Sequence, residues 1–480
     1  MELTRREWSR GLIAAAAMLS AGCGTISPAR ERELGRGEAE EIERTMGLVQ
    51  EPRVLGYVRQ VGARLAEAAQ RSDISWEFSI ADDASANAFA LPGGWCYVTR
   101  GLLVLLNSED ELAGVLGHEM AHVLERHAVR RAEAATPFAV LFGVPAAILG
   151  TVSPTVGDIV SGTGRLASGA ALASYTRDQE READDRGIAL AARAGWDPRG
   201  LARALRTMER EDALAGKDPG RVRFFASHPT APERVARIEA AALAPTKTAT
   251  PPARARDAFV RRLDGLVVGD NPAIGVFVGS RFVHPELDVA LEMPARWKTL
   301  KSREAAGALA PDGDAAMIVH AVTAGDDPVA GAKADGLGEA SLKQLKRRQI
   351  ASLPAAGLVA NTRDGDRVTL TWIAHRHRII RVTGIAKGSA WDRHGGTLER
   401  ATESFRPLRS SDREPLVHSR LRIRPAGAGE TVAQVLGRGG GTWDAAQMAV
   451  ANGTTQEARL DAGWPVKVPV AERYVSAGGA

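Results

Sequence analysis

A short motif constrains the fold of this chain more than any other feature of its sequence. His118 and His122 stand four residues apart, and Glu119 follows the first of them. Residues at positions i and i+4 lie on the same face of an α-helix, so the two imidazoles can act together only if this segment is helical. The periodicity of residues 108–131 predicts such a helix, and Ser108, with a glutamate three residues later, predicts a capping box at its start. The sequence therefore predicts a helix that presents two metal ligands on one face.

The residue types of this motif indicate zinc. Zinc is bound by histidine nitrogens and carboxylate oxygens, and a catalytic site keeps a fourth position open beside three protein ligands. Glu119 lies where it can act as a general base toward a water molecule in that position. In one extended form of this zinc-binding motif, a glycine and a third histidine follow the second histidine. In this chain those two positions hold Glu125 and Ala128, so this extended motif does not supply the third ligand. His127 is one residue short, and we interpret it as a group on the helix surface or behind a ligand.

A second helix downstream offers the missing ligand. The pattern of residues 177–194 predicts a helix that ends at Gly195, and within it Glu180 and Asp184 again share one face. Glu180 would bind the metal, and Asp184 would hydrogen-bond a ligand histidine. Charged helices usually present such side chains to solvent, however, and Glu182 is nearly as good a candidate for the ligand. The residues alone leave the choice open.

The two segments together resemble a known family. His-Glu-x-x-His on one helix, followed about sixty residues later by Glu-x-Glu-Ala-Asp on a second helix, is similar to the gluzincin metallopeptidase family of the CAAX prenyl endopeptidase and its bacterial periplasmic, BepA-like branch. Residues 87–90, 92–94 and 109–117 also match that family, and the resemblance covers residues 35–242. It implies a zinc-dependent endopeptidase that hydrolyses peptide bonds of envelope proteins, in protein quality control.

The resemblance also implies a role for each residue of the two motifs. One zinc ion per chain is held by His118, His122 and Glu180, so that the first glutamate of the second helix is the ligand. Asp184 contacts a ligand histidine from behind, and Glu119 is the general base.

Further residues receive a role from the same resemblance. His228, in the sequence Ser-His-Pro, matches a histidine that approaches the metal and either holds the enzyme latent or helps to polarise the substrate. Arg234 is a candidate for stabilising an oxyanion. An extended peptide would pair with an edge strand by β-augmentation. This substrate-binding strand consists of Asn87, Ala88, Phe89 and Ala90.

The first residues predict export. A basic start is followed by the apolar run 11–19 and by small residues before Cys23, which resembles the signal peptide of a bacterial lipoprotein. We expect residues 1–22 to be removed and Cys23 to carry a lipid that holds the protein at the periplasmic face of a membrane. Gly24, which is not an aspartate, favours the outer membrane. With Cys23 acylated, the second cysteine, Cys96, has no partner for a disulfide within the chain.

Length and composition indicate several globular domains. The 480 residues are 44 % hydrophobic and 25 % charged, and a net charge of +4 is too small to indicate nucleic-acid binding. We expect a multidomain protein, with a mainly α-helical zincin-type α+β protease domain, then an α+β domain and a small C-terminal α+β module. The expected boundaries are 1–22 for the signal peptide, 23–242 for the metallopeptidase domain, 243–256 for a linker, 257–408 for an α+β domain of unknown role and 421–470 for the module.

The expected second domain offers no comparable chemistry. His375 and His377 alternate on one predicted strand and imitate a metal pair, but no third ligand is evident, and we interpret them as an exposed strand face. In the first domain, the apolar run 137–150 predicts a buried or interfacial helix, because it is too short to span a membrane. In the second domain, strands are predicted at residues 276–282, 289–293, 317–321, 368–374 and 379–385, and helices at 337–348 and 396–405.

The C-terminal segment predicts the order strand, helix, helix, strand. This order resembles a LysM glycan-binding module, which would make peptidoglycan a partner, but the glycine-rich insertion 437–441 departs from that pattern. A generic small α+β cap is the competing interpretation.

Two functions follow from these observations. The first is an active zinc endopeptidase whose substrates are envelope proteins. The second is a latent, metal-bearing chaperone or assembly factor of the envelope, in which His228 blocks the metal. A Glu119→Gln variant separates them, because a chaperone would keep its cellular function in that variant.

Overall fold

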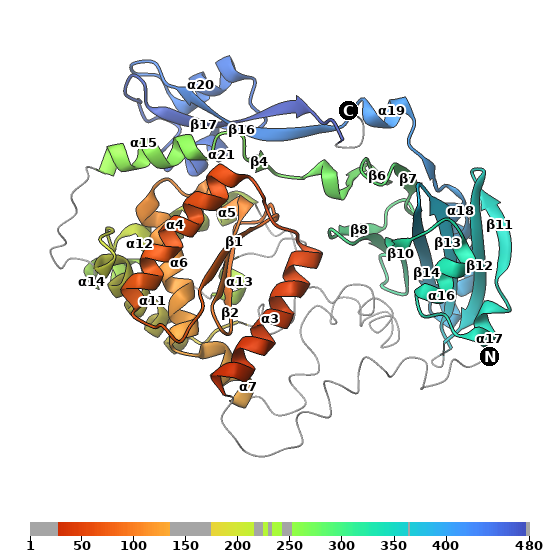
Figure 1. Cartoon of the computed structure of the whole chain (residues 1–480). Coiled ribbons are helices and arrows are strands. Elements are labelled where there is room, and N and C mark those ends of the chain that lie inside the picture. Colours follow the sequence, from red (N-terminus) through yellow and green to blue (C-terminus); the bar gives the residue numbers. More distant parts are fainter. Residues whose placement is uncertain are drawn as a thin grey trace.

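The computed structural model describes residues 27–134, 174–215, 224–228, 233–241, 252–362 and 365–476. Its elements form an N-terminal unit (27–241), a middle unit (270–413) and a C-terminal module (417–473), which Figure 1 colours from red through green to blue. The predicted signal peptide with Cys23 and the apolar run 137–150 lie outside the described residues. Among the helices that the structure does describe, none combines the length and apolarity that a membrane span requires.

Two helices begin the N-terminal unit. Helices α3 (Pro28–Thr45) and α4 (Pro52–Ala69) each have proline in the first turn, where the missing backbone N–H has no helical partner to lose. Helix α4 packs on strand β1 (Glu77–Ala81), and Gly62 approaches the Phe78 ring so closely that a Cβ would lie 2.4 Å from it. The apolar face of α4 that enters the core consists of Val54, Val58, Val61 and Leu65.

A three-stranded sheet follows. Strand β3 (Trp95–Thr99) pairs parallel with β1 (Glu77–Ala81) and antiparallel with β2 (Ala88–Leu91), so β2 is an edge of this sheet. The hairpin that the sequence predicts over residues 87–99 is confirmed. Gly93 and Gly94 form its turn with φ values of 85° and 110°, which only glycine adopts without strain.

Helix α6 lies at the centre of the unit, and all its residues from 111 to 124 are buried. Gly117 of α6 faces Gly187 of α11, and a Cβ on Gly187 would lie 2.8 Å from the backbone nitrogen of His118. Glycine at this point allows the two helices to approach closely. The helices of the unit after β3 are α5 (Arg100–Leu105), α6 (Glu109–Leu124), α7 (His127–Ala134), α11 (Arg177–Arg193), α12 (Gly200–Ala215), α13 (Phe224–Ser227) and α14 (Arg234–Ala241).

The single helix predicted over residues 108–131 is wrong in one respect. The chain leaves the helical conformation at Arg126, whose φ is +54°, so α6 ends before it and α7 begins after it. The predicted capping box is half formed. The Ser108 hydroxyl accepts from the Glu111 backbone N–H, but the Glu111 carboxylate accepts from the backbone N–H of Asn107.

The middle unit is built around a seven-stranded antiparallel sheet, with helix α18 (Trp391–Glu403) on one face. The strand order is β11-β12-β13-β14-β10-β9-β8, with bounds Lys346–Ile350, Leu353–Asn361, Arg367–His375, Arg378–Ala386, Ala315–Ala324, Ala305–Leu309 and Lys298–Lys301. A second sheet has the order β15-β7-β6-β5, with bounds Arg406–Pro407, Val289–Glu292, Arg281–His284 and Val276–Val278. The predicted strands 289–293, 317–321, 368–374 and 379–385 and the predicted helix 396–405 are thus confirmed.

Two predictions in the middle unit are wrong. The helix predicted over residues 337–348 consists of a four-residue helix α17 (Glu339–Leu342) and the edge strand β11, and a further helix α16 (Pro328–Ala334) precedes them. Leucines at 337, 342 and 345 imitate a helical face, but they pack from the loop and α17 onto the sheet. The strand predicted over 276–282 is a hairpin of β5 and β6.

The C-terminal module has the predicted element order. Strand β16 (Val417–Pro425), helices α20 (Val432–Gly439) and α21 (Ala445–Ala451) and strand β17 (Pro465–Arg473) follow one another, and β16 pairs with β17. Strand β16 also pairs with β4 (Val267–Val268). The order alone does not identify the module.

Helix α15 joins this module to the N-terminal unit. It spans Pro252–Arg262 and therefore begins inside the segment interpreted as a linker. Phe259, Val260 and Leu263 lie in the same apolar core as α4 and α6, together with Leu421 of β16. Lys467 of β17 is fully buried, and its ammonium donates to the carbonyls of residues 104 and 106 at 2.7 and 2.8 Å. Residues after 252 thus complete the N-terminal core.

Candidate metal centre

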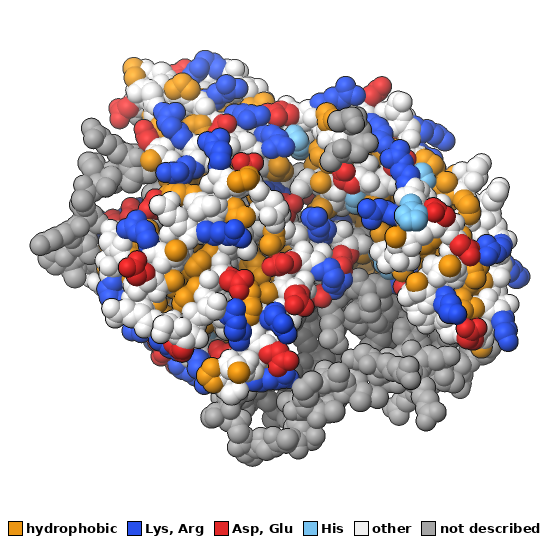
Figure 2. Space-filling model, viewed as in Figure 1, with side chains coloured by type: hydrophobic (Ala, Val, Ile, Leu, Met, Phe, Trp, Pro, Cys, Tyr) orange, Lys and Arg blue, Asp and Glu red, His pale blue; other side chains and the backbone are white. Residues whose placement is uncertain are grey.

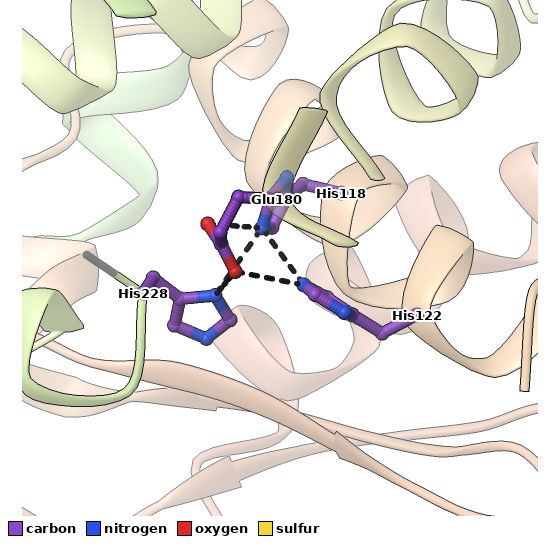
Figure 3. A group of neighbouring side chains, drawn as sticks. All are labelled: His118, His122, Glu180 and His228. Atoms are coloured by element: carbon purple, nitrogen blue, oxygen red, sulfur yellow. Dashed lines mark hydrogen bonds and ion pairs between the residues drawn. The ribbon is translucent and has the colours of Figure 1, made fainter. Parts of the chain in front are cut away.

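Three histidines and one glutamate converge inside the N-terminal unit. His118 and His122 come from α6, Glu180 from the first turn of α11 and His228 from the end of α13 (Figure 3). One ligand atom from each of the four residues lies within 4.8 Å of the others, and all four side chains are buried. Among the described residues, this is the group of His, Cys, Asp and Glu side chains that is able to hold a metal ion.

The nitrogens of these rings lie very close together. His118 Nε2 is 3.1 Å from His122 Nε2 and 3.3 Å from His228 Nδ1. Glu180 Oε1 is 2.9 Å from His228 Nδ1 and 3.5 Å from His122 Nε2. A metal ion bound by these nitrogens and the Glu180 oxygen would fit so close an arrangement.

Local structure explains why the four residues meet. The i, i+4 spacing aligns His118 and His122, and the glycine contact between α6 and α11 brings Glu180 opposite them. Backbone hydrogen bonds fix the third segment: Tyr175 N–H donates to the Ser227 carbonyl at 3.0 Å, and Phe224 N–H donates to the carbonyl of residue 86 at 3.2 Å. The His228 ring stacks on Phe224 with a centroid distance of 4.3 Å.

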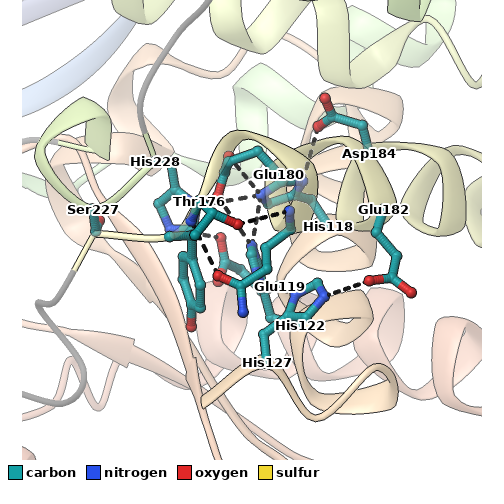
Figure 4. A network of polar contacts seen from close by, with 12 residues as sticks. His118, Glu119, His122, His127, Thr176, Glu180, Glu182, Asp184, Ser227 and His228 are labelled. Atoms are coloured by element: carbon teal, nitrogen blue, oxygen red, sulfur yellow. Dashed lines mark hydrogen bonds and ion pairs between the residues drawn. The ribbon is translucent and has the colours of Figure 1, made fainter. Parts of the chain in front are cut away.

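His118 is held from behind by a carboxylate. Its Nδ1 lies 3.1 Å from Asp184 Oδ1 (Figure 4). Arg234 and Arg237 each hold Asp184, with nitrogens at 2.8 Å, and Arg234 also lies 2.8 Å from Glu180 Oε2. Burial opposes the ionisation of Asp184, but its contacts with His118 and Arg234 outweigh burial, so its pKa lies below its ordinary value. The sequence suggested an oxyanion role for Arg234, whereas the structure places it on the carboxylates that orient the ligands.

His122 has different neighbours. Its Nδ1 lies 2.8 Å from Nδ1 of His127, which is fully buried and reaches Glu182 at 3.0 Å. Glu182 therefore lies away from the ligand group, with 43 % of its side chain exposed. On its other side, His122 stacks on the Tyr175 ring with a centroid distance of 3.8 Å. Sequence reasoning missed Tyr175, although an aromatic residue directly before the cap of α11 was a signal for it.

Glu119 lies on the same side of α6 as the ligands. It is fully buried, and the backbone N–H of Ala90 on the edge of β2 lies near its carboxylate. Its Oε1 lies 3.6 Å from His228 Nε2. Burial and the nearby charge of Glu180 raise the pKa of Glu119 well above its ordinary value. Glu119 is therefore suited to take up and release a proton during a reaction.

The donor set fits zinc. Burial lowers the pKa of His118, and burial with the neighbouring imidazoles lowers that of His122, so both rings are neutral and offer lone pairs. Imidazole nitrogens with one carboxylate oxygen are typical zinc ligands, whereas magnesium and calcium prefer oxygen alone. The buried carboxylate of Glu119 beside them is consistent with a site of hydrolysis.

The predicted substrate strand borders this group. The Thr99 N–H donates to the Asn87 carbonyl at 2.9 Å. In an antiparallel pair, the backbone N–H and C=O groups of alternate residues point toward the partner strand, and this bond shows which residues of β2 do so. Residues 87, 89 and 91 therefore face β3, and the backbone groups of Ala88 and Ala90 face the free edge. A surface depression lies at that edge. Its lining includes Ala90, Leu91, His122, Val129 and Tyr175.

Comparisons with known proteins agree with this arrangement. Residues 52–242 match Peptidase family M48. Mitochondrial metalloendopeptidase OMA1 of Schizosaccharomyces pombe is 33 % identical over 184 residues, which cover 38 % of this chain and 51 % of that protein. The beta-barrel assembly-enhancing protease of Yersinia pestis is 30 % identical over 236 residues, 48 % of each chain. Metalloprotease YcaL of Escherichia coli K12 is 34 % identical over 156 residues, 32 % of this chain and 58 % of that protein. The chain spans about half the length of the curated relatives that it matches.

Proposed function

We propose that this chain is a zinc-dependent endopeptidase that hydrolyses envelope proteins in protein quality control, because residues 52–242 match Peptidase family M48. The observation that carries the proposal is the convergence of ligand atoms from four buried residues within 4.8 Å, beside the buried carboxylate of Glu119. The relatives support the substrate class, since one of them is a beta-barrel assembly-enhancing protease.

In this proposal, His118, His122 and Glu180 hold the zinc. When bound, zinc polarises the scissile carbonyl and lowers the pKa of water. Glu119 takes up the proton of the attacking water and delivers it to the leaving amine, for which its raised pKa is suited. Asp184, held by two arginines, keeps His118 in the tautomer that presents Nε2 to the ligand group.

His228 is proposed to keep the site inactive in this conformation. Its Nδ1 is one of the four converging atoms, and its Nε2 is 3.6 Å from Glu119, so the ring occupies the space between the metal ligands and the general base. We infer that this ring holds the enzyme latent until the segment around α13 moves. The alternative of a chaperone without proteolysis has no observation of its own in its favour.

The substrate is proposed to add to the edge of β2. The backbone groups of Ala88 and Ala90 face the free edge, next to the depression that reaches His122 and Tyr175. An Ala88→Pro variant is therefore expected to lose peptide cleavage and keep its zinc. Unchanged cleavage by this variant would exclude pairing at β2.

The cellular setting is proposed from the sequence. Residues 1–22 are taken as a lipoprotein signal peptide and Cys23 as the lipidated residue, which places the protein at the periplasmic face of a membrane, with the outer membrane favoured. The module of residues 421–470 is proposed to be LysM-like, and its element order supports this. Peptidoglycan is then a second partner.

Zinc content is the test of the site. We expect the purified chain, supplied with one equivalent of zinc, to retain it, and Glu180→Ala to lose most of it. Asp178→Ala is the matched control, because Asp178 lies on the same first turn of α11 with its side chain 93 % exposed. Equal zinc retention by Glu180→Ala and the control would move the third ligand elsewhere, and no zinc in the wild type would refute the enzyme.

A further inference from the structure

A chain of hydrogen bonds behind His122 runs to the protein surface. His122 Nδ1 lies 2.8 Å from His127 Nδ1, and His127 Nε2 lies 3.0 Å from Glu182 Oε2 (Figure 4). His127 is fully buried, whereas the Glu182 side chain is 43 % exposed and also contacts Arg130 at 3.2 Å. Behind His118, by contrast, lies a buried carboxylate, Asp184, which Arg234 and Arg237 hold.

The break between α6 and α7 makes this contact. In a continuous helix, a residue five positions after His122 would point about 140° away from it, since each residue turns the helix by about 100°. The positive φ of Arg126 ends α6 and starts α7 at His127, so the His127 ring turns back onto His122. The two ring planes meet at 69° with centroids 4.9 Å apart.

The positions of the protons along this chain follow from its far end. A carboxylate only accepts hydrogen bonds, so a His127 ring that carries a single proton holds it on Nε2, facing Glu182. Nδ1 of His127 is then an acceptor, and His122 must keep its own proton on Nδ1 to donate to it. This leaves the lone pair of His122 on Nε2, the atom that belongs to the ligand group. The reverse arrangement would put a proton on the metal-binding nitrogen.

We propose that His127 is a positioning residue that selects the tautomer of His122, and that Glu182 selects the tautomer of His127. The proposal rests on the proposed zinc site and adds a residue that the family motif of two histidines and one glutamate does not contain. His127 and Glu182 act only through His122, and neither contacts the reacting atoms.

Three variants of the full-length chain test this proposal. His127→Phe keeps a ring but removes both hydrogen bonds, and we expect about 10- to 100-fold weaker zinc binding, the range for lost outer contacts of a ligand. His127→Asn places an amide oxygen close to the position of Nδ1, so it should recover part of this loss. Glu182→Gln should cause a smaller loss than His127→Phe. Each zinc Kd would be measured by competition with a chromophoric chelator.

Glu125→Gln is the matched control. Glu125 also pairs with Arg130, at 3.4 Å, so this variant loses an Arg130 ion pair as Glu182→Gln does. Among the described residues it has no contact with His127, and its zinc Kd should equal that of the wild type. A wild-type Kd in both His127→Phe and Glu182→Gln would overturn the proposal. If His127→Phe does not fold, His127→Asn and Glu182→Gln decide the question.

A second measurement separates this inference from the proposed function. Long-range ¹H–¹⁵N spectra of the zinc-free chain should show His122 protonated on Nδ1, and a mixture of tautomers in His127→Phe. Zinc binding by the wild type with unchanged tautomers in the variant would refute the positioning role alone. No zinc binding by the wild type would refute the proposed function.

Discussion

The N-terminal and middle units both bury histidines beside carboxylates, but they arrange them differently. In the N-terminal unit, four ligand atoms meet within 4.8 Å. In the middle unit, three histidines each meet a separate aspartate: His375 meets Asp288 at 3.0 Å, His377 meets Asp326 at 2.8 Å and His394 meets Asp314 at 3.0 Å. His375 and His377 do not share a strand face, as the sequence interpretation held, because His377 lies in the turn after β13 with a φ of +54°. Convergence, rather than the number of histidines, distinguishes a metal site from a set of ion pairs.

On the surface, too, acidic and basic side chains lie close to one another. Figure 2 shows acidic and basic side chains interspersed over one face of the molecule. The small net charge of +4 is consistent with this. The buried ligand group of the N-terminal unit therefore stands apart from the ordinary ion pairing of the rest of the described chain.

The largest expected effect comes from breaking the convergent group. His122→Ala should weaken zinc binding by more than the roughly 100-fold that loss of an outer contact causes, because it removes a ligand. His375→Ala should leave zinc binding unchanged. Chelator competition on both variants measures this, and a loss of zinc from His375→Ala would contradict the comparison.

Glu119→Gln separates holding the metal from using it. The amide keeps the shape of the side chain but cannot accept the proton, so we expect kcat to fall by about 10²- to 10⁴-fold while zinc content is unchanged. Cleavage of an unfolded protein and metal analysis of the same sample provide the two readouts. Undiminished cleavage would exclude Glu119 as the base.

A buried histidine of the middle unit should make that unit acid-sensitive. Burial and then the charge of Arg381 lower the pKa of His320 to about 3. Between pH 6.5 and 3, the unfolded chain binds a proton that the folded chain excludes, so stability falls as the pH drops through this window. From pH 7 to 5 this amounts to about 2 kcal/mol. His320→Leu should lose less stability over that range, as measured by hydrogen exchange in β10 and β14. An unchanged pH dependence would contradict this assignment.

The smallest effect is expected from the exposed pair. The side chains of His377 and Asp326 are 75 % and 73 % exposed, so His377→Gln should change the unfolding free energy by less than about 0.5 kcal/mol. Denaturant titration at pH 7 provides the measurement. A loss of unfolding free energy above about 1 kcal/mol would contradict the interpretation of His377 and Asp326 as an ordinary surface ion pair.

The residues of the site that could be predicted from the sequence are those that short-range patterns along the chain indicate. The i, i+4 spacing and the glycine-ended helix placed His118, His122 and Glu180 on two helices, and the family resemblance chose Glu180. Tyr175 and the contacts of Arg234 depend on chain segments about 50 to 110 residues apart, which no periodicity encodes.

The fold shows the same division. Strongly periodic segments such as α6, α11 and β14 were predicted, whereas strands β8, β9, β11 and β12 were missed. Strand β9 consists of four small or apolar residues around a glycine (AAGAL), which carries little alternation. Strand β11 (KRRQI) is an edge whose charged side chains hide the strand pattern.

The burial of Lys467 has a consequence for the order in which this protein can mature. Its ammonium caps the carbonyls just before α6, and Leu421 and α15 fill the core beside that helix. A growing chain therefore carries its peptidase motif long before the residues that close the core around it emerge. The N-terminal unit therefore completes its core only when the distant C-terminal strands arrive. A chain cut before residue 417 should accordingly be degraded faster by an added protease than the intact one.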